Sequence, residues 1–227
     1  FSYLQTQTTN DVNELKPGQG QNNAIVDRKA RVISTFSLHR TGEGSAVILV
    51  EAIQKENLLN HLNTFLFRED VSLTSSNHFV LALQGPKSQE IIKSFTQSRA
   101  SIPEKPNGIC EFTFDEQSAL AINKSLTGEE GCVLAFPAKS KETITHKLLE
   151  IEQQNSLVEI DPHAREVFRI EAGIPCFGKD INGKNILPET GLEHSSVSYS
   201  KGCYIGQEVI ARIKTYGAPN FALMGLI

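Results

Sequence analysis

The sequence contains no tryptophan, a single methionine and only four cysteines among its 227 residues. Cys110, Cys132, Cys176 and Cys203 form no CxxC unit, and no histidine lies at zinc-finger spacing from them. This pattern favours reduced, mostly buried thiols over a disulfide framework. The six histidines are scattered without ligand spacing, so no metal site is predicted.

Positive charge and long apolar runs are also scarce. The net charge is −4. Because a duplex-binding protein usually carries a basic excess, nucleic acid is not an expected partner. No apolar run approaches the length of a membrane span, and the start lacks a charged-then-apolar signal segment, so no membrane association is expected. P-loop, dinucleotide-binding and nucleophile-elbow motifs are absent too.

What remains is a composition typical of a soluble globular protein, with 39% hydrophobic and 21% charged residues. Its length suits one large domain or two modest ones. Residues 32–38 and 46–50 read as two strands of a hairpin with its turn at Gly42–Gly44. From Lys55 the apolar spacing becomes helical and predicts a helix over 55–67.

The next hundred residues predict a ferredoxin-like α+β unit over 46–154. Its remaining elements are a strand at 79–83, a helix after Gly85-Pro86, strands at 109–115 and 132–136, and a helix at 141–151. Asp161-Pro162 then begins a helix over 162–172, since Asp caps free N–H groups and Pro suits the first helical position. An irregular stretch follows at 173–192, before a short helix at 206–214.

Three acidic residues are candidates for a ligand site. Glu171 continues the apolar stripe of the 162–172 helix, so we expect it to point toward the core, where an anion needs a partner. The structural alternatives are an internal salt bridge to Arg169 or Arg165, or a position at a solvated edge. Glu189 and Asp180 read as loop acids exposed to water. Together the three could instead form an acidic pocket for a ligand rich in N–H donors, such as a pterin.

Cys203 lies between Gly202 and Tyr204, close to Lys201 and just before the predicted 206–214 helix. Positive charge and free N–H groups at that place favour a thiolate with a lowered pKa. The alternative is a small buried core residue, which is also the interpretation for Cys110 and Cys132 in or beside apolar strands.

The run Lys201-Gly202-Cys203-Tyr204-Ile205-Gly206-Gln207-Glu208 resembles the signature of the YgfZ family, whose more distant relatives include the glycine-cleavage aminomethyltransferases. Supporting segments are Arg169 to Pro175, Gly178-Lys179-Asp180, Leu187-Pro188-Glu189 and, more weakly, Asp27 to Arg31, so the resemblance covers the whole chain. It implies an aminomethyltransferase-like folate-binding α+β fold, with a discontinuous folate-binding unit (1–45 plus 155–216), the ferredoxin-like unit (46–154) and the start of a largely missing C-terminal β-barrel (217–227).

The resemblance also implies function. Tetrahydrofolate or a derivative is the expected ligand, held by Glu171, Glu189, Arg169, Tyr204 and Gln207, with Cys203 and Lys201 as functional groups at the mouth of the site. Similar proteins support assembly or repair of iron–sulfur enzymes, including a tRNA-modifying one. The expected partners are therefore folate and iron–sulfur assembly proteins or client enzymes. A monomer in the cytoplasm, or in the mitochondrial matrix of a eukaryote, is expected.

Two departures bear on activity. Aminomethyltransferases carry a catalytic Asp where this chain has Ile33 and Ser34, so glycine-cleavage activity is not expected. The family usually has glycine where this chain has Ala30. Two alternatives to the accessory role stay open: a folate-dependent one-carbon transferase, and an interaction module that has lost its ligand.

Overall fold

The computed structural model describes residues 1–97, 100–153 and 157–225. The chain forms two compact units, unit 1 from Phe1–Thr74 with Pro175–Ile227 and unit 2 from Ser75–Ile174. These bounds differ from the expected 46–154 because the second hairpin strand and the helix after it pack in unit 1, while the helix beginning at Pro162 belongs to unit 2. No helix within the described ranges is long and apolar enough to cross a bilayer.

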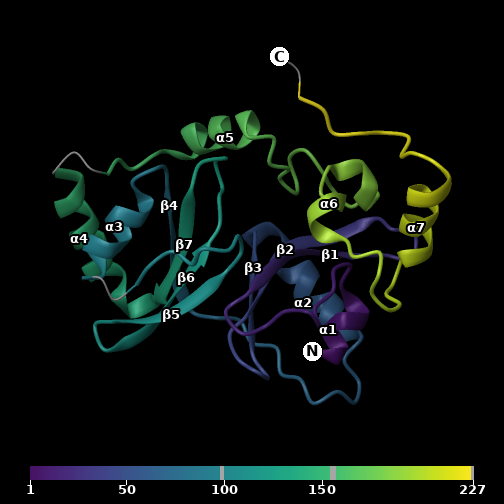
Figure 1. The fold of residues 1–227 in the computed structure, drawn as a ribbon, viewed down its shortest axis with the longest axis horizontal. Coiled ribbons are helices and arrows are strands. Elements are labelled where there is room, and N and C mark those ends of the chain that lie inside the picture. Colours follow the sequence, from purple (N-terminus) through teal and green to yellow (C-terminus); the bar gives the residue numbers. More distant parts are fainter. Residues whose placement is uncertain (98–99, 154–156, 226–227) are drawn as a thin grey trace. The chain divides into compact units, whose positions relative to one another are not determined.

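Unit 1 is built on a three-stranded antiparallel sheet in the order β1-β2-β3 (Figure 1). Its strands are β1 (Gly20–Val26), β2 (Val32–Arg40) and β3 (Ala46–Val50). The predicted β2–β3 hairpin is confirmed, with Arg40 paired to Ala46 and Thr41 N–H bonded to the Ser45 carbonyl at 3.0 Å.

The turn between β1 and β2 forms with alanine at position 30, where the resemblance described above leads to an expectation of glycine. Ala30 N–H donates to the Asp27 carbonyl at 2.9 Å, and Ala30 takes a left-handed φ of 61°. Such a conformation is unfavourable for a residue with a Cβ. The Asp27 carboxylate stabilises the turn by accepting the backbone N–H groups of Lys29 and Arg31 at 2.8 and 2.9 Å.

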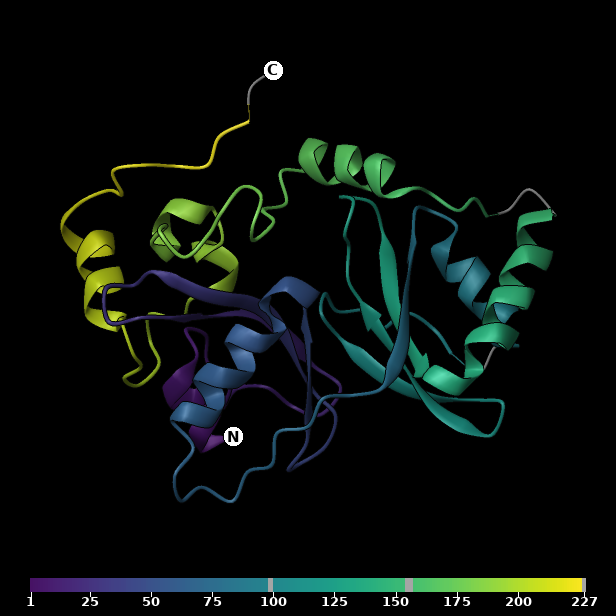
Figure 2. The same ribbon diagram turned by 180° about the vertical axis from the view of Figure 1, so that it is seen from behind.

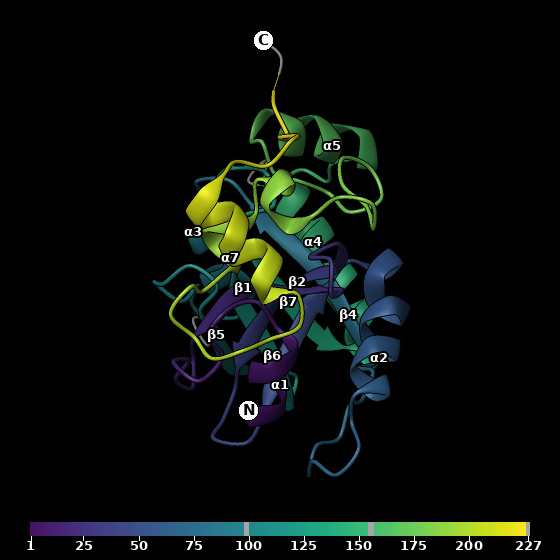
Figure 3. The same ribbon diagram turned by 90° about the vertical axis from the view of Figure 1, so that its right-hand side faces the viewer.

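Both faces of the unit 1 sheet are covered. Helices α1 (Ser2–Gln7) and α2 (Lys55–Thr64) pack on the face that carries Ile25 and Leu38. The opposite face carries Ala24 and Val32, and packs against η3 (Leu187–Thr190) and α7 (Gln207–Tyr216), with α6 (Glu193–Ser196) beside β1. Figure 3 shows α7 and α2 on either side of β1 and β2. A short 3₁₀ helix, η1 (Ala52–Gln54), leads from β3 into α2.

Unit 2 has a four-stranded antiparallel sheet in the order β4-β7-β6-β5, with two helices packed on it (Figure 2). Its elements are β4 (His78–Gln84), α3 (Ser88–Phe95), β5 (Ile109–Phe114), β6 (Gln117–Asn123), β7 (Gly131–Pro137), η2 (Ala138–Ser140) and α4 (Lys141–Gln153). Its core gathers Phe95, Phe114 and Phe136, with ring centroids 5.1 to 5.9 Å apart. Every element predicted between residues 79 and 151 is present.

Strand β6 is the element of unit 2 that was not predicted from the sequence. It follows β5 through a two-residue turn, Asp115-Glu116, in which both residues have positive φ, 46° and 61°. That conformation matches the twist of a tight hairpin but is normally signalled by Asn-Gly or Asp-Gly. Without such a signal, residues 109–123 do not reveal two strands.

Helix α5 (Pro162–Glu171) begins as predicted. The Asp161 carboxylate accepts the N–H groups of His163 and Ala164 at 2.7 and 2.8 Å, and Pro162 occupies the first helical position. The cap therefore fixes the helix start.

Candidate functional site

Lys201 is buried inside unit 1, with 7% of its surface exposed. Its ammonium group donates to the carbonyl oxygens of Gln5, Thr8 and Asn10 at 2.8, 2.6 and 2.8 Å. Burial lowers the pKa of Lys201 to about 8, although the Asp11 carboxylate acts to raise it. All three N–H donors of the ammonium group are thus used to tie the 201–208 segment to the end of α1, rather than being directed at a ligand.

Of the residues that follow Lys201, Tyr204 is buried and Cys203 is exposed. Tyr204 is 8% exposed, and its ring lies 5.1 Å from the Lys201 ammonium nitrogen. Burial, with a further contribution from Glu193, raises the pKa of Tyr204 to about 12. Cys203 is an exposed free thiol. It precedes the first residue of α7, Gln207, by four positions, so it stands before the helix start rather than in its first turn.

Gly206 explains why this segment needs glycine. Its φ is 83°, and a Cβ there would lie 2.5 Å from the Asp27 carbonyl oxygen and 2.7 Å from a methyl group of Val26. Both the left-handed conformation and the close approach exclude a side chain. The 201–208 segment is therefore packed directly on the turn between β1 and β2.

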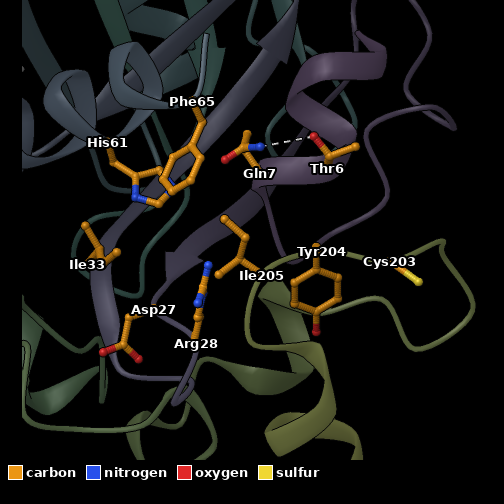
Figure 4. A pocket seen from close by; sticks show the side chains of 10 residues that line it. All are labelled: Thr6, Gln7, Asp27, Arg28, Ile33, His61, Phe65, Cys203, Tyr204 and Ile205. Atoms are coloured by element: carbon orange, nitrogen blue, oxygen red, sulfur yellow. Dashed lines mark hydrogen bonds between the residues drawn. The ribbon is translucent and has the colours of Figure 1, made fainter. Parts of the chain in front are cut away.

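A pocket of about 600 Å³ opens beside this contact, entirely within unit 1. Its walls come from the end of α1, the β1–β2 turn, the start of β2, α2 and the 201–208 segment (Figure 4). The lining residues are Thr6, Gln7, Asp27, Arg28, Ile33, His61, Phe65, Cys203, Tyr204 and Ile205. The volume is in the range of small-molecule sites, and the lining mixes aromatic and aliphatic side chains with a few polar groups.

Two polar atoms of the lining residues are buried without a hydrogen-bond partner, Gln7 Oε1 and His61 Nε2. The Gln7 amide nitrogen donates to Thr6 Oγ1 at 3.1 Å, and Figure 4 shows its oxygen pointing toward the side formed by His61 and Phe65. Burial lowers the pKa of His61, so its ring is neutral at pH 7. An unpaired buried acceptor is unfavourable, and an N–H or O–H donor of a ligand would satisfy it.

Asp27 supplies the one carboxylate in the described lining of this pocket. It forms an ion pair with Arg31 at 2.7 Å and accepts two turn N–H groups. Burial alone would raise the pKa of the Asp27 carboxyl group. The hydrogen bonds from Arg31 and Lys29 outweigh this effect, so the pKa is lowered. A carboxylate held in this way is a weak base, so it does not replace an acid missing from the neighbouring strand.

Ile33 and Ser34 occupy the place in β2 where the resemblance to aminomethyltransferases leads to an expectation of a catalytic Asp. Ile33 lines the pocket, and Ser34 is fully buried, with its hydroxyl oxygen among the described atoms that have no hydrogen-bond partner. Neither side chain can act as a carboxylate base.

Glu171 does not point toward the core, so of the structural alternatives the structure favours the solvated edge. Glu171 is exposed at the end of α5, and so are Val167 and Phe168 of the predicted inward stripe. The buried residue of this helix is Arg169, which donates from Nε to a Glu166 carboxylate oxygen at 3.2 Å and also to the Ile174 carbonyl. These bonds fix the C-terminal end of the helix, and Arg169 pairs with Glu166 rather than with Glu171.

Glu189 and Asp180 each bind backbone in unit 1. A Glu189 carboxylate oxygen accepts the N–H of Ile186 at 3.1 Å, which closes the start of η3. The Asp180 carboxylate accepts the N–H of Cys176 at 2.8 Å. Both acids have a local structural bond, and neither lines the pocket. Because Glu171 lies in unit 2 and Glu189 in unit 1, their joint role stays a prediction.

Of the predicted site residues, Cys203 and Tyr204 are thus in the pocket lining, while Lys201 and Gln207 flank them in the chain. Sequence reasoning missed Gln7, Arg28, His61 and Phe65. Gln7 and His61 sit on ordinary amphipathic helices, so only their unpaired atoms in the folded structure distinguish them. None of the four cysteines forms a disulfide, but only Cys132 is buried, so the expectation of mostly buried thiols is wrong. The described residues form no cluster of three or more His, Cys, Asp or Glu suited to a metal.

The fold is similar to that of a solved aminomethyltransferase. The crystal structure of glycine cleavage system aminomethyltransferase T from Bartonella henselae matches with a TM-score of 0.83 at 21% sequence identity, over 96% of this chain and 58% of that chain. The predicted aminomethyltransferase-like α+β fold is therefore confirmed. The described chain has two antiparallel sheets and no closed barrel.

Sequence comparison then shows the family. The family model described as the GCVT N-terminal domain matches residues 1–199, so the chain belongs to this family. Curated aminomethyltransferases are similar along nearly the whole chain: that of Halalkalibacterium halodurans is 27% identical over 100% of this chain and 62% of its own length, and that of Oceanobacillus iheyensis is 30% identical over 92% and 58%. The chain thus spans about 60% of the length of such relatives, as for Geobacillus thermodenitrificans.

Proposed function

We propose that this chain is the ligand-binding part of a YgfZ-type tetrahydrofolate-binding accessory protein that supports assembly or repair of iron–sulfur enzymes, including tRNA-modifying ones. One observation carries the proposal: Cys203, within the 201–208 signature, is an exposed thiol in the lining of the unit 1 pocket. An exposed thiol beside a ligand site is available for chemistry. Cys132 is different, because burial raises the pKa of its thiol to about 12.

The pocket supports a folate-like ligand by its composition. Phe65, Ile33 and Ile205 offer apolar surface for a flat ring, and Gln7 and Arg28 offer polar groups. Tyr204 supplies part of the wall. Further ligand contacts, from outside the described lining of the pocket, are proposed for Glu171, Glu189, Arg169 and Gln207. Lys201 acts through the position of the segment that it anchors.

Calorimetric titration of the 227-residue chain with (6S)-5-formyltetrahydrofolate tests the ligand. Saturable heat at micromolar to millimolar ligand is the expected result, and its absence would sink the folate proposal. Glu171→Gln and Glu189→Gln then test the two acids separately. If both leave the affinity unchanged, neither binds the pterin edge.

The accessory role is tested through Cys203. In cells that lack the protein, a Cys203→Ala copy is expected to be as abundant as the natural protein but to leave dependent iron–sulfur enzymes inactive. Cys176→Ala is the matched control, because Cys176 is partly buried and outside the pocket lining. Full recovery of enzyme activity with Cys203→Ala would remove this thiol from the mechanism. Action as a monomer in the cytoplasm, or in the mitochondrial matrix of a eukaryote, together with iron–sulfur assembly proteins or client enzymes, belongs to the same proposal.

A folate-dependent one-carbon transferase is the second candidate, because the similar curated proteins are aminomethyltransferases. Ile33 and Ser34 stand where a transferase needs its acid, and Asp27 is a weakened base. An assay for tetrahydrofolate-dependent one-carbon release from candidate amines separates the two roles. Turnover would favour the transferase. Binding without turnover favours the accessory protein, and absence of folate binding favours the interaction module.

A further inference from the structure

The unit 1 pocket has an acceptor at one end that the protein itself leaves unsatisfied. Gln7 is only 9% exposed, and its Oε1 has no hydrogen-bond partner. The amide nitrogen is already committed to Thr6 Oγ1. Gln7 lies on α1, whose end is held by Lys201, so the backbone that carries this side chain is fixed in place. A ligand N–H group directed at it would satisfy it.

Next to this acceptor, two aromatic rings form part of the wall. The His61 and Phe65 ring centroids lie 4.8 Å apart with the rings tilted by 45°, and Ile33 lines the same pocket. His61 Nε2 is likewise buried without a partner. A neutral imidazole nitrogen donates or accepts according to its tautomer, so it can adapt to either kind of ring atom. This end therefore suits a planar heterocycle that carries at least one N–H donor.

The other end of the lining is charged. Arg28 is exposed on the β1–β2 turn, where the neighbouring Asp27 carboxylate is engaged by Arg31 at 2.7 Å. Figure 4 shows Arg28 beside Ile205, in a part of the lining separate from Gln7 and Thr6. A guanidinium group in this place is suited to a carboxylate.

We propose that the pocket fixes the direction of its ligand, with the N–H-bearing ring at Gln7 and His61 and a carboxylate tail at Arg28. The inference rests on the proposed function, since a reduced folate has both parts. It assigns ligand specificity to three residues: Gln7 of α1, His61 of α2 and Arg28 of the β1–β2 turn.

Three probes separate the two ends: (6S)-5-formyltetrahydrofolate, a reduced pterin without a tail, and p-aminobenzoyl-L-glutamate without a pterin. Gln7→Met and His61→Phe are each expected to weaken the first two about ten-fold and to leave the third unchanged, as for one lost hydrogen bond. Arg28→Met is expected to weaken the first and third by about the same factor, to spare the pterin, and to reduce the salt dependence of binding.

Gln19→Met and Lys29→Met are the matched controls, because both residues lie outside the lining, and Lys29 adjoins Arg28 in the same turn. Thermal unfolding of every variant checks that the fold is kept, and His61→Phe serves in place of Gln7→Met if the latter unfolds. Folate binding that none of the variants alters, or that they alter with the two ends reversed, overturns this inference alone. Absence of binding of all three probes to the natural chain overturns the proposed function and this inference together.

Discussion

Replacing Lys201 by Met is expected to destabilise unit 1 while leaving unit 2 intact. Methionine keeps most of the side-chain volume but removes the ammonium group that donates to the carbonyls of Gln5, Thr8 and Asn10. Those carbonyls belong to the end of α1 and the loop after it. The substitution leaves them buried without their donor, which is the costly half of a broken hydrogen bond.

The magnitude follows from two opposing contributions. Three hydrogen bonds from a charged donor contribute about 1.5–3 kcal/mol each. Against them stands the desolvation that lowers the pKa of Lys201 from 10.5 to about 8, which costs about 3.5 kcal/mol at roughly 1.4 kcal/mol per pKa unit. The net loss expected for Lys201→Met is therefore about 1–6 kcal/mol, centred near 3.

Hydrogen exchange read by mass spectrometry is the direct assay, supported by urea unfolding monitored by circular dichroism. Amides of α1 and of residues 8–10 are expected to exchange faster in Lys201→Met, while those of β4 and β7 keep their rates. Lys184→Met, at an exposed lysine of unit 1, is the control and is expected to change stability by less than about 0.5 kcal/mol. Unchanged exchange at residues 2–10 in Lys201→Met would refute the anchoring role.

The pH dependence gives an independent check with a definite sign. The pKa of Lys201 is lower in the folded chain, about 8, than the ordinary 10.5. Between these values the unfolded chain binds more protons, so the contribution of Lys201 to stability rises with pH. The stability difference between the natural chain and Lys201→Met is thus expected to widen from pH 8 to 10.5. A difference that narrows over this range would show that the ammonium form is the one favoured by folding.

Three further outcomes are expected. Because burial raises the pKa of Tyr204 to about 12, its stabilising contribution is complete below pH 10 and is lost toward pH 12. Burial also raises the pKa of Tyr3 and of Tyr199, so the Tyr204→Phe variant is expected to lose one of several late-titrating parts of the phenolate absorbance at 295 nm. Gly206→Ala places a Cβ 2.5 Å from the Asp27 carbonyl oxygen and is expected to cost about 2–4 kcal/mol in urea unfolding, whereas Gly202→Ala, which meets no atom within 4 Å, is expected to cost much less. Asp161→Ala removes the two cap bonds of α5, and a loss of about 1 kcal/mol with faster exchange at residues 163–165 is expected; no change in exchange there would contradict the cap.

Much of the fold was predictable because local signals agree with it. The helical spacing from Lys55 and the Asp161-Pro162 pair each identified a helix that the structure contains. Strand β6 was not predictable, since its turn uses Asp115-Glu116 in a conformation usually marked by glycine. The bounds of the units were missed because they depend on which sheet a strand joins, and β3 pairs with β2 across a hairpin.

The candidate site was predictable only in part for a related reason. Cys203 and Tyr204 stand in a recognisable segment, and both are in the pocket lining. The direction of Glu171 was misjudged because periodicity describes one helix and not its neighbours: Arg169 is buried instead through its bonds to Glu166 and Ile174. Gln7 and His61 gain their significance from unsatisfied atoms, which no sequence pattern records.

The anchoring of α1 by Lys201 has a consequence for the order in which the chain folds. The Thr9 carbonyl accepts the N–H of Ser198, and three further carbonyls at the end of α1 accept from the Lys201 ammonium group. These groups therefore bind partners nearly two hundred residues away in the sequence. Such distant pairing closes a very long loop and slows folding. Unit 2, a continuous stretch, can form while synthesis proceeds. The pocket, by contrast, cannot be completed until the ribosome has released the segment that carries Lys201 and Cys203. A nascent chain cut short of residue 201 is therefore expected to expose the α1 end to chaperones and proteases.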